Sequence, residues 1–297
     1  MTSEPAPDLE STAGPSRRLS AATVVVGVIG DPVDHSLSPR LHNAAFDELG
    51  LDWVSVGFPV PEGQASAALA GVRALGIRGL SVTMPHKSAV AALGDRRTPL
   101  ADRLGAVNCI SNLDGSLEGD STDGPGLIDS LRRGGDFDPT DRRCLVVGAG
   151  GAARGVIAAL ADAGAAAVVV VNRTPARGED AAALAGPVGR FGSADDVPEA
   201  ELVVNATPTG MLDIGGVVDQ PWALDPTRLH PGQLVVDLVY HPPVTPWLAA
   251  AEEQGARVLN GLGMLVHQAA LQLTIWTALE PPVDAMWRAA TGFEPPR

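Results

Sequence analysis

A glycine-rich turn between a predicted strand and a predicted helix constrains the fold of this chain most. The apolar run Cys144–Val147 leads into Gly148-Ala149-Gly150-Gly151-Ala152-Ala153, which has the spacing G-x-G-x-x-A. In such a turn the first glycine permits a tight bend, the second lets backbone approach a pyrophosphate, and the small last residue packs helix on strand. The amides and the dipole of the helix then hold the phosphates. We therefore predict a dinucleotide site here, with a glycine-rich turn that binds no ligand as the alternative.

The next predicted strand, Ala166–Val171, indicates which dinucleotide is bound. NAD enzymes place an Asp or Glu at the end of this strand, where it accepts from the ribose 2′-hydroxyl. This chain instead has Asn172-Arg173-Thr174, with Arg177 one helical turn further on. Two guanidinium groups suit a 2′-phosphate, and Arg173 can also stack on adenine. We predict NADP rather than NAD. The alternative is two solvated arginines, which the start of a helix disfavours.

Apolar runs alternate with helical patterns along the chain, which is typical of α/β proteins with parallel sheets. The predicted strands are Val24–Ile29, Asp52–Phe58, Gly79–Thr83, Asn108–Asn112, Ser116–Glu118, Cys144–Val147, Ala166–Val171, Leu202–Asn205, Leu234–Leu238 and Arg257–Leu259. The predicted helices are Pro39–Leu49 with Ser38 as N-cap, Gln64–Leu75, Gly124–Arg133, Gly150–Ala163, one that starts at Pro175 with Thr174 as N-cap, and Leu262–Leu279. The pair Asp114-Gly115 predicts a hairpin.

Composition narrows the class of protein. A chain of 297 residues that is 45% hydrophobic suggests two modest domains. A formal net charge of -14 argues against nucleic acid as a partner, and no apolar run is long enough to span a membrane. Residues 1–20 lack the apolar stretch of a secretory signal, so we predict a disordered tail and a cytoplasmic protein. Cys109 and Cys144 lack metal-ligand spacing, so we expect buried thiols and no metal site.

Lys87 is the only lysine in the chain, which has 21 Lys and Arg residues in total. Arginine cannot lose its proton in a protein, whereas a lysine amine can. The other twenty of these basic residues are arginines, so a need for proton transfer would explain why a lysine stands at position 87. The alternative is chance. Lys87 also closes the polar run Ser81-Val82-Thr83-Met84-Pro85-His86-Lys87 at the end of a predicted strand.

Further polar residues of the N-terminal half stand near strand ends. Ser36 and Ser38 follow the first strand and begin a helix, where two hydroxyls either bind a carboxylate or cap the helix. Asn108 and Asp123 terminate later strand-like stretches. Each residue is ambiguous alone, but hydroxyl, amide, carboxylate and amine groups that converge suit a small polyol.

A series of motifs runs in order along the chain. They are His35-Ser36-x-Ser38-Pro39-x-x-His42-Asn43, Val82-Thr83-Met84-Pro85-His86-Lys87, Gly105-Ala106-Val107-Asn108, Thr122-Asp123-Gly124, the turn at Gly148, Asn172-Arg173-Thr174, Asn205-Ala206-Thr207-Pro208-x-Gly210-Met211, Asp237-Leu238-Val239-Tyr240 and Asn260-Gly261-x-Gly263-Met264-Leu265-x-x-Gln268. On these motifs the sequence from Val24 to about Ala290 resembles the shikimate dehydrogenase family. So many ordered matches are far more specific than any single one.

The resemblance implies an α/β fold with an N-terminal substrate domain, completed by the C-terminal helix, and a Rossmann-type NADP-binding domain. We expect the substrate domain at residues 21–123 and 262–297 and the NADP domain at 124–261, with the active site between them. The implied catalytic pair is Lys87 and Asp123. The substrate-binding residues would be Ser36, Ser38, Ser81, Thr83, Lys87, Asn108, Asp123, Tyr240 and Gln268. The cofactor-binding residues would be Gly148, Gly150, Gly151, Ala152, Asn172, Arg173, Thr174, Arg177, Thr207, Leu238 and Gly261.

The implied reaction is the reversible NADP-dependent reduction of 3-dehydroshikimate to shikimate, a step of chorismate and aromatic amino-acid biosynthesis. The resemblance leaves open whether Lys87, Asp123 or water transfers the proton, and whether the chain forms a homodimer. Ser81 and Ser121 stand where Asn is usual, and Cys109 stands where Thr is usual. These departures leave the preferred ring alcohol open.

Three alternatives remain at this point. A relative that acts on quinate or an aminoshikimate would use the same residues. A non-catalytic NADP-binding sensor on the same scaffold predicts the loss of Lys87 or Asp123, and both are present. An enzyme similar to methylene-folate dehydrogenase shares the architecture but gives no reason for the Ser36 and Ser38 pair.

Overall fold

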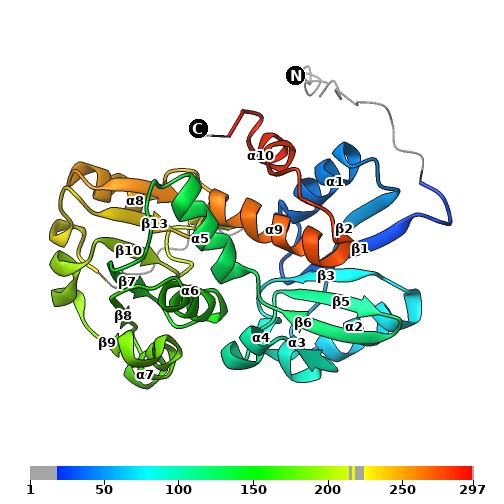
Figure 1. Cartoon of the computed structure of the whole chain (residues 1–297), viewed down its shortest axis with the longest axis horizontal. Helices are drawn as coiled ribbons and strands as arrows, with labels where there is room; N and C mark the ends of the chain where they lie inside the picture. The colour runs from blue at the N-terminus through cyan, green and yellow to red at the C-terminus, as the bar shows by residue number, and fades with distance from the viewer. Residues whose placement is uncertain (1–18, 214–215, 218–223, 296–297) are drawn as a thin grey trace, which may run out of the picture.

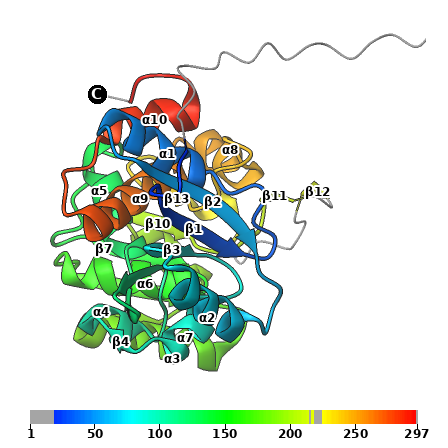
Figure 2. The same cartoon turned by 90° about the vertical axis from the view of Figure 1, so that its right-hand side faces the viewer.

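The computed structural model describes residues 19–213, 216–217 and 224–295. Two six-stranded sheets lie side by side along the long axis of the molecule (Figure 1). A short antiparallel pair, β11 (Leu212–Asp213) and β12 (Gly216–Val217), lies apart from both sheets (Figure 2). Most of the predicted tail, residues 1–20, falls outside the described residues. In the part of the chain that is described, no helix is long and apolar enough to cross a bilayer.

The first sheet is built from the N-terminal part of the chain. Its strands in spatial order are β2 (Trp53–Pro59), β1 (Val24–Gly30), β3 (Gly79–Val82), β5 (Cys109–Leu113), β6 (Ser116–Asp120) and β4 (Arg96–Arg97). β1 runs parallel to β2 and β3, whereas β5 runs antiparallel to β3 and β6. The hairpin between β5 and β6 turns at Asp114 and Gly115, which both have positive φ, as an Asp-Gly pair predicts.

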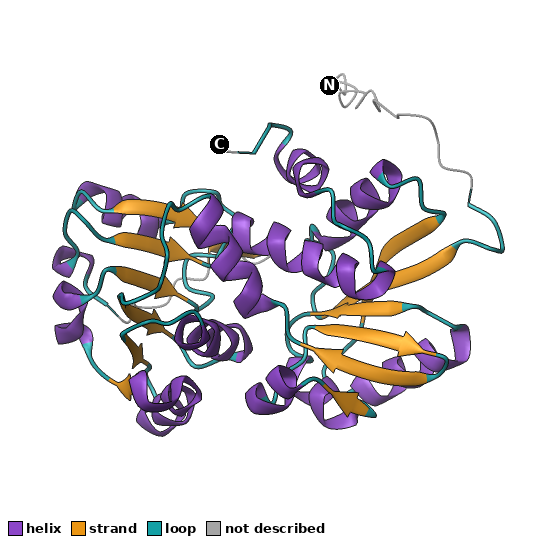
Figure 3. Cartoon of the chain, viewed as in Figure 1, coloured by secondary structure: helices purple, strands orange, loops and turns teal. Residues whose placement is uncertain are grey.

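Helices cover both faces of this first sheet (Figure 3). The helices on one face are α1 (Ser38–Glu48), α9 (Leu262–Thr277) and α10 (Val283–Thr291), which share an apolar core with Val26 of β1. The helices on the other face are α2 (Ala65–Leu75), α3 (Lys87–Leu93) and α4 (Pro99–Leu104). The C-terminal segment therefore completes a domain that the N-terminal segment begins, as expected for the fold class.

The second sheet is parallel throughout. Its strands in spatial order are β14 (Arg257–Asn260), β13 (Leu234–Asp237), β10 (Leu202–Asn205), β7 (Arg143–Val147), β8 (Ala167–Val171) and β9 (Gly189–Phe191). Its helices are α5 (Asp123–Arg133), α6 (Gly151–Asp162), α7 (Pro175–Ala182) and α8 (Pro246–Glu253), with 3-10 turns at Ala183–Val188, Ala194–Glu199 and Pro226–Arg228. This is the doubly wound order, in which ligands bind where the strand order reverses. Here the reversal lies between β7 and β10.

Helices α5 and α9 pass between the two sheets and join them (Figure 1). The start of α5 touches α6 directly, because a Cβ on Gly124 would lie only 2.3 Å from the carbonyl oxygen of Gly155. Arg154 of α6 also donates from Nε to the carbonyl oxygen of Leu104, over 2.9 Å. These close contacts hold the two sheets near one another.

Most predicted elements agree with the structure to within one or two residues, and both cysteines are buried thiols as expected. The predicted N-cap of α1 was wrong, because this helix begins at Ser38 with Leu37 as N-cap. The predicted N-cap of α7 was confirmed: Thr174 holds that position ahead of Pro175, although its side chain makes no capping bond. Pro39 and Pro175 each lie in the first turn of a helix, where a proline suits the backbone because it fixes φ and its missing N–H would be unpaired there anyway.

Candidate active site

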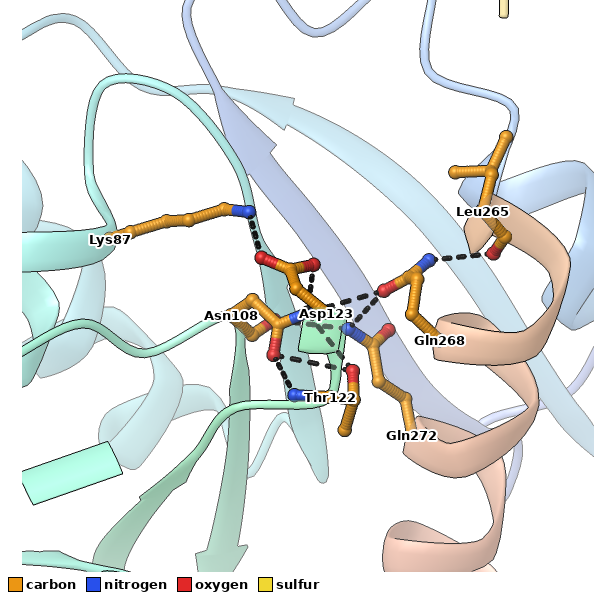
Figure 4. A network of polar contacts seen from close by, with 7 residues as sticks. All are labelled: Lys87, Asn108, Thr122, Asp123, Leu265, Gln268 and Gln272. Atoms are coloured by element: carbon orange, nitrogen blue, oxygen red, sulfur yellow. Dashed lines mark hydrogen bonds and ion pairs between the residues drawn. The ribbon is translucent and has the colours of Figure 1, made fainter. Parts of the chain in front are cut away.

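Lys87 and Asp123 form an ion pair between the two sheets (Figure 4). Lys87 begins α3, and Asp123 begins α5 instead of ending a strand as expected. Lys87 Nζ lies 2.5 Å from Asp123 Oδ2, and the two side chains are 17% and 8% exposed. The ammonium group has no other hydrogen-bond partner among the described residues, so its remaining N–H groups can reach a ligand oxygen.

Asn108 holds the other oxygen of the same carboxylate. Its Nδ2 donates to Asp123 Oδ1 over 2.7 Å, and its Oδ1 accepts from the amide of Thr122 over 2.7 Å. Asn108 directly precedes β5 and does not end a strand; its carbonyl oxygen accepts from the amide of Val82 over 2.8 Å. The Asp123 carboxylate is therefore fixed on both sides, with Oδ1 bound by Asn108 and Oδ2 by Lys87.

Gln268 reaches this network from α9. Its Oε1 accepts from Asn108 Nδ2 over 3.3 Å, and its Nε2 donates to the carbonyl oxygen of Leu265 over 2.9 Å. A carboxamide carries two N–H donors. One donor of Gln268 therefore has no partner in the described chain and can bind a ligand hydroxyl.

The predicted carboxylate site lies where the loop after β1 leads into α1, with Ser36 in the loop and Ser38 as the first residue of the helix. Ser38 is buried, and Ser36 Oγ accepts from the Ser38 amide over 3.3 Å. The Ser38 hydroxyl has no hydrogen-bond partner among the described residues. Tyr240, the only tyrosine of the chain, reaches this loop from far along the sequence, close enough to the Leu37 backbone for it to lower the pKa of the phenol. Burial raises the pKa of Tyr240 and outweighs that opposing effect. The fold thus brings three hydroxyls to one loop.

Ser81 and Thr83 lie at the end of β3, next to the same loop. The Thr83 amide donates to the carbonyl oxygen of Ile29 over 2.9 Å, and the Asp31 amide donates to that of Met84 over 3.0 Å. The chain segments that leave β1 and β3 therefore also lie side by side. Neither the Ser81 nor the Thr83 hydroxyl has a hydrogen-bond partner in the part of the chain described.

The glycine turn after β7 has the geometry that a pyrophosphate needs. Gly148 has φ of +115°, and a Cβ on it would lie 3.0 Å from the carbonyl oxygen of Ala206. Gly150 is the N-cap of α6, and no atom lies within 4 Å of where its Cβ would be. The amides of Gly151 and Ala152 have no partner among the described residues. A phosphate group can therefore approach this backbone and accept from it, so the residues fit a dinucleotide.

Two arginines follow β8, the strand next to β7 and its glycine turn. Arg173 and Arg177 are both exposed, and neither forms an ion pair within the described residues. Asn172 Nδ2 donates to the carbonyl oxygen of Thr174 over 2.9 Å, which fixes the turn between them. Two unpaired guanidinium groups and no carboxylate at the strand end suit a 2′-phosphate.

A buried carboxylate organises the ends of β10 and β13. Asp237 Oδ1 accepts from Asn205 Nδ2 over 3.0 Å, and Asn205 Oδ1 accepts from Thr207 Oγ1 over 2.7 Å. Burial raises the pKa of Asp237 to about 6. Leu238 follows directly, and its carbonyl oxygen lies 2.0 Å from where a Cβ on Gly261 would be. The fold therefore brings Thr207, Leu238 and Gly261 to the strand ends beside the glycine turn.

The dinucleotide turn and the ion pair lie against one another. A Cβ on Gly151 would be 3.4 Å from Lys87 Cδ, and a Cβ on Gly155 would be 3.6 Å from Asp123 Cβ. An amine, a carboxylate and a dinucleotide site thus adjoin, which suits hydride transfer coupled to proton transfer. In the described part of the chain, no three His, Cys, Asp or Glu side chains gather in a way that could hold a metal ion.

Sequence reasoning did not single out the residues that hold the site in shape. Asn205 and Asp237 are paired partners in register at the ends of two buried strands, and polar residues at such positions were an available signal. Thr122, beside Asp123, binds Asn108. Gln272 is fully buried one turn after Gln268 in an apolar helix, and a polar residue at that spacing was also a signal.

Three family models match successive parts of the chain. The shikimate dehydrogenase substrate binding domain matches residues 28–110, shikimate / quinate 5-dehydrogenase matches residues 134–210, and the shikimate 5'-dehydrogenase C-terminal domain matches residues 261–291.

Whole-chain relatives agree with these models. The chain is 47% identical to a shikimate dehydrogenase (NADP(+)) of Moorella thermoacetica, over 91% of this chain and 94% of that protein. It is 46% identical to the enzyme of the same name from Citrifermentans bemidjiense, over 91% and 96%. It superposes with a TM-score of 0.82 on the shikimate 5-dehydrogenase of Thermus thermophilus, crystallised with NADP(H) and shikimate, at 37% identity and with coverage of 90% and 98%. The chain therefore belongs to the shikimate dehydrogenase family.

Proposed function

We propose that the chain catalyses the reversible, NADP-dependent reduction of 3-dehydroshikimate to shikimate. The observation that carries this proposal is the Lys87–Asp123 pair, which lies against the glycine turn at the junction of the two sheets. Family membership and relatives that bear the name shikimate dehydrogenase (NADP(+)) support it. Retention of the pair argues against a non-catalytic sensor.

The bound cofactor supplies the hydride in this reaction, and the residues of the chain handle the proton. As hydride arrives at C3, the carbonyl oxygen becomes an alkoxide and needs one proton. Lys87 Nζ can donate that proton, and Asp123 Oδ2, 2.5 Å away, orients the amine and remains a carboxylate. In the reverse direction the neutral amine takes the hydroxyl proton.

The other polar residues would bind parts of the substrate that do not react. Ser36, Ser38 and Tyr240 present hydroxyls that suit its carboxylate. The residues proposed to hold the ring hydroxyls and neighbouring groups are Ser81, Thr83, Asn108, Asp123 and Gln268. The carboxamide of Gln268 retains one free donor for this purpose.

The cofactor would lie across the strand ends of the second sheet. Gly148, Gly150, Gly151 and Ala152 would bind the pyrophosphate. The residues proposed for the adenosine 2′-phosphate are Asn172, Arg173, Thr174 and Arg177. The residues proposed to line the nicotinamide are Thr207, Leu238 and Gly261. We also propose domain boundaries at residues 21–123 with 262–297 and at 124–261; a homodimer and a cytoplasmic location stay predictions.

A rate measurement at the absorbance band of NADPH tests the proposal. The purified chain is given NADP+ or NAD+ with shikimate, quinate or an aminoshikimate, and NADPH with the dehydro forms. We expect the highest kcat/KM with shikimate and NADP+. A preference for quinate would move the proposal to that substrate, and no turnover with any of these compounds would contradict it.

A further inference from the structure

Gln272 lies behind the proposed substrate site and is fully buried. Its Nε2 donates to the carbonyl oxygen of Asn108 over 3.1 Å and to Gln268 Oε1 over 2.9 Å. A backbone carbonyl can only accept a hydrogen bond. The bond to Asn108 therefore identifies the nitrogen of the Gln272 carboxamide, and that nitrogen in turn requires the oxygen of Gln268 to face it (Figure 4).

This requirement decides which way the Gln268 amide points. With Oε1 turned toward Gln272 and Asn108, Nε2 turns toward the carbonyl oxygen of Leu265 and keeps one N–H without a partner in the described chain. The flipped amide would place an N–H group against two donors and leave buried donors without acceptors, which costs about 1–3 kcal/mol for each unpaired group. Gln272 therefore selects the rotamer in which Gln268 offers a donor to a ligand hydroxyl.

His42 of α1 packs edge-on against Trp276, which lies one turn after Gln272 on α9. Its Nδ1 pairs with Ser55 Oγ at 3.1 Å, whereas His42 Nε2 and Gln272 Oε1 are both buried without a hydrogen-bond partner among the described residues. The two groups are close enough for Gln272 to raise the pKa of His42, against the larger effect of burial, which lowers it to about 4. A neutral imidazole that accepts from Ser55 carries its proton on Nε2, the complement of the Gln272 oxygen.

We propose that Gln272, braced by His42, is a positioning residue that orients the carboxamide of Gln268 and the backbone of Asn108 for substrate binding. It touches neither substrate nor cofactor and acts through those two residues. This inference rests on the proposed function, because it assigns Gln268 to the substrate.

The main test replaces Gln272 with methionine, which has similar length and no hydrogen-bonding amide. We expect the KM for shikimate to rise about tenfold, the equivalent of one neutral hydrogen bond near the upper end of its range. The KM for NADP+ should stay within about twofold, and kcat should fall less than the KM for shikimate rises.

Gln233→Met is the matched control. Gln233 is also fully buried, and its Nε2 donates to the carbonyl oxygens of Val197 and Ala200, each over 2.8 Å, in the second sheet's domain. If Gln272→Met acted only by lowering stability, both variants would change the KM for shikimate by the same factor. We expect Gln233→Met to lower Tm and leave the KM for shikimate unchanged. An equal rise of that KM in both variants would overturn the inference.

A second pair of variants keeps the test open if Gln272→Met does not fold. His42→Leu removes the proposed donor to Gln272, whereas His42→Gln supplies an amide donor in its place. We expect the KM for shikimate to rise in His42→Leu and to return toward the wild-type value in His42→Gln. Equal KM values in the two variants would overturn the role of His42 as a brace.

A double-mutant cycle tests the route through Gln268. In the Gln268→Ala background, Gln272→Met should raise the KM for shikimate clearly less than it does in the wild type, because residues that share a contact are not additive. A full effect in both backgrounds would overturn the route. An inactive wild type would instead contradict the proposed function, so the two failures are distinguishable.

Discussion

The replacement Arg173→Ala isolates the proposed contact with the 2′-phosphate. Arg173 is exposed and forms no ion pair within the described residues, so its truncation breaks no ion pair there. Surface changes of this kind alter the unfolding free energy by about 0.5 kcal/mol or less. An effect on catalysis would therefore report binding and not folding.

The size of the effect follows from the chemistry of the lost contact. A hydrogen bond to a charged group contributes about 1.5–3 kcal/mol, which corresponds to a fall in kcat/KM of about 10- to 150-fold. NADP+ should show this fall because it carries the 2′-phosphate. NAD+ lacks that group, so its kcat/KM should stay within about twofold.

Initial rates with both cofactors at saturating shikimate measure this prediction. Arg142→Ala is the control. Arg142 is also an exposed arginine of the same domain, paired with Glu201, and its loss should leave kcat/KM unchanged for both NADP+ and NAD+. Equal kcat/KM for NADP+ and NAD+ in the wild type, or an equal fall for both in Arg173→Ala, would refute the reasoning.

Three further predictions follow from the same geometry. Ser36→Ala with Ser38→Ala should raise the KM for shikimate more than it lowers kcat, because a carboxylate that does not react binds equally in ground and transition states; an unchanged KM would reduce both serines to structural roles. Gly148→Ala should cost about 1–3 kcal/mol of stability and weaken NADP+ binding, since φ is +115° and the new Cβ would lie 3.0 Å from the Ala206 carbonyl oxygen; unchanged Tm and affinity would contradict it. Burial lowers the pKa of His42 from 6.5 to about 4, so the neutral imidazole stabilises the fold fully above pH 6.5. As the pH falls to about 4, the free energy of unfolding should drop by about 3 kcal/mol. Denaturant unfolding of the wild type should show this loss, and that of His42→Gln should not.

The elements that could be predicted from the sequence are those with a strong local signal. Five of the six strands of the second sheet were predicted because they are short apolar runs bounded by turns, and Leu202–Asn205 was predicted to the residue. The three-residue strand β9 was not predicted. The glycine turn and the Asp-Gly hairpin were predicted because each needs a backbone conformation that few residues adopt. Helices such as α3 and α4 were not predicted, since six or seven residues are too few for a clear periodicity.

The candidate site was predicted as a set of residues and not as an arrangement. Lys87 and Asp123 were named from motifs, but their 2.5 Å contact depends on how α3 and α5 meet, which no local pattern states. Tyr240 reaches the Leu37 loop across about two hundred residues of sequence, a contact that only the fold creates. Gln272 went unnoticed because its spacing one turn after Gln268 marks it as a buried polar residue but does not reveal which groups it pairs with.

The turnover of Lys87→Arg tests the central claim most directly. Arginine keeps the positive charge and roughly the reach toward Asp123, but it cannot release a proton. Because a positioned acid–base group contributes about 10²–10⁴-fold, we predict a fall of that order in kcat for shikimate oxidation. Shikimate and NADP+ should still bind, as ligand-induced rises in Tm would show. A kcat close to that of the wild type would contradict the account and move proton transfer from Lys87 to Asp123 or water.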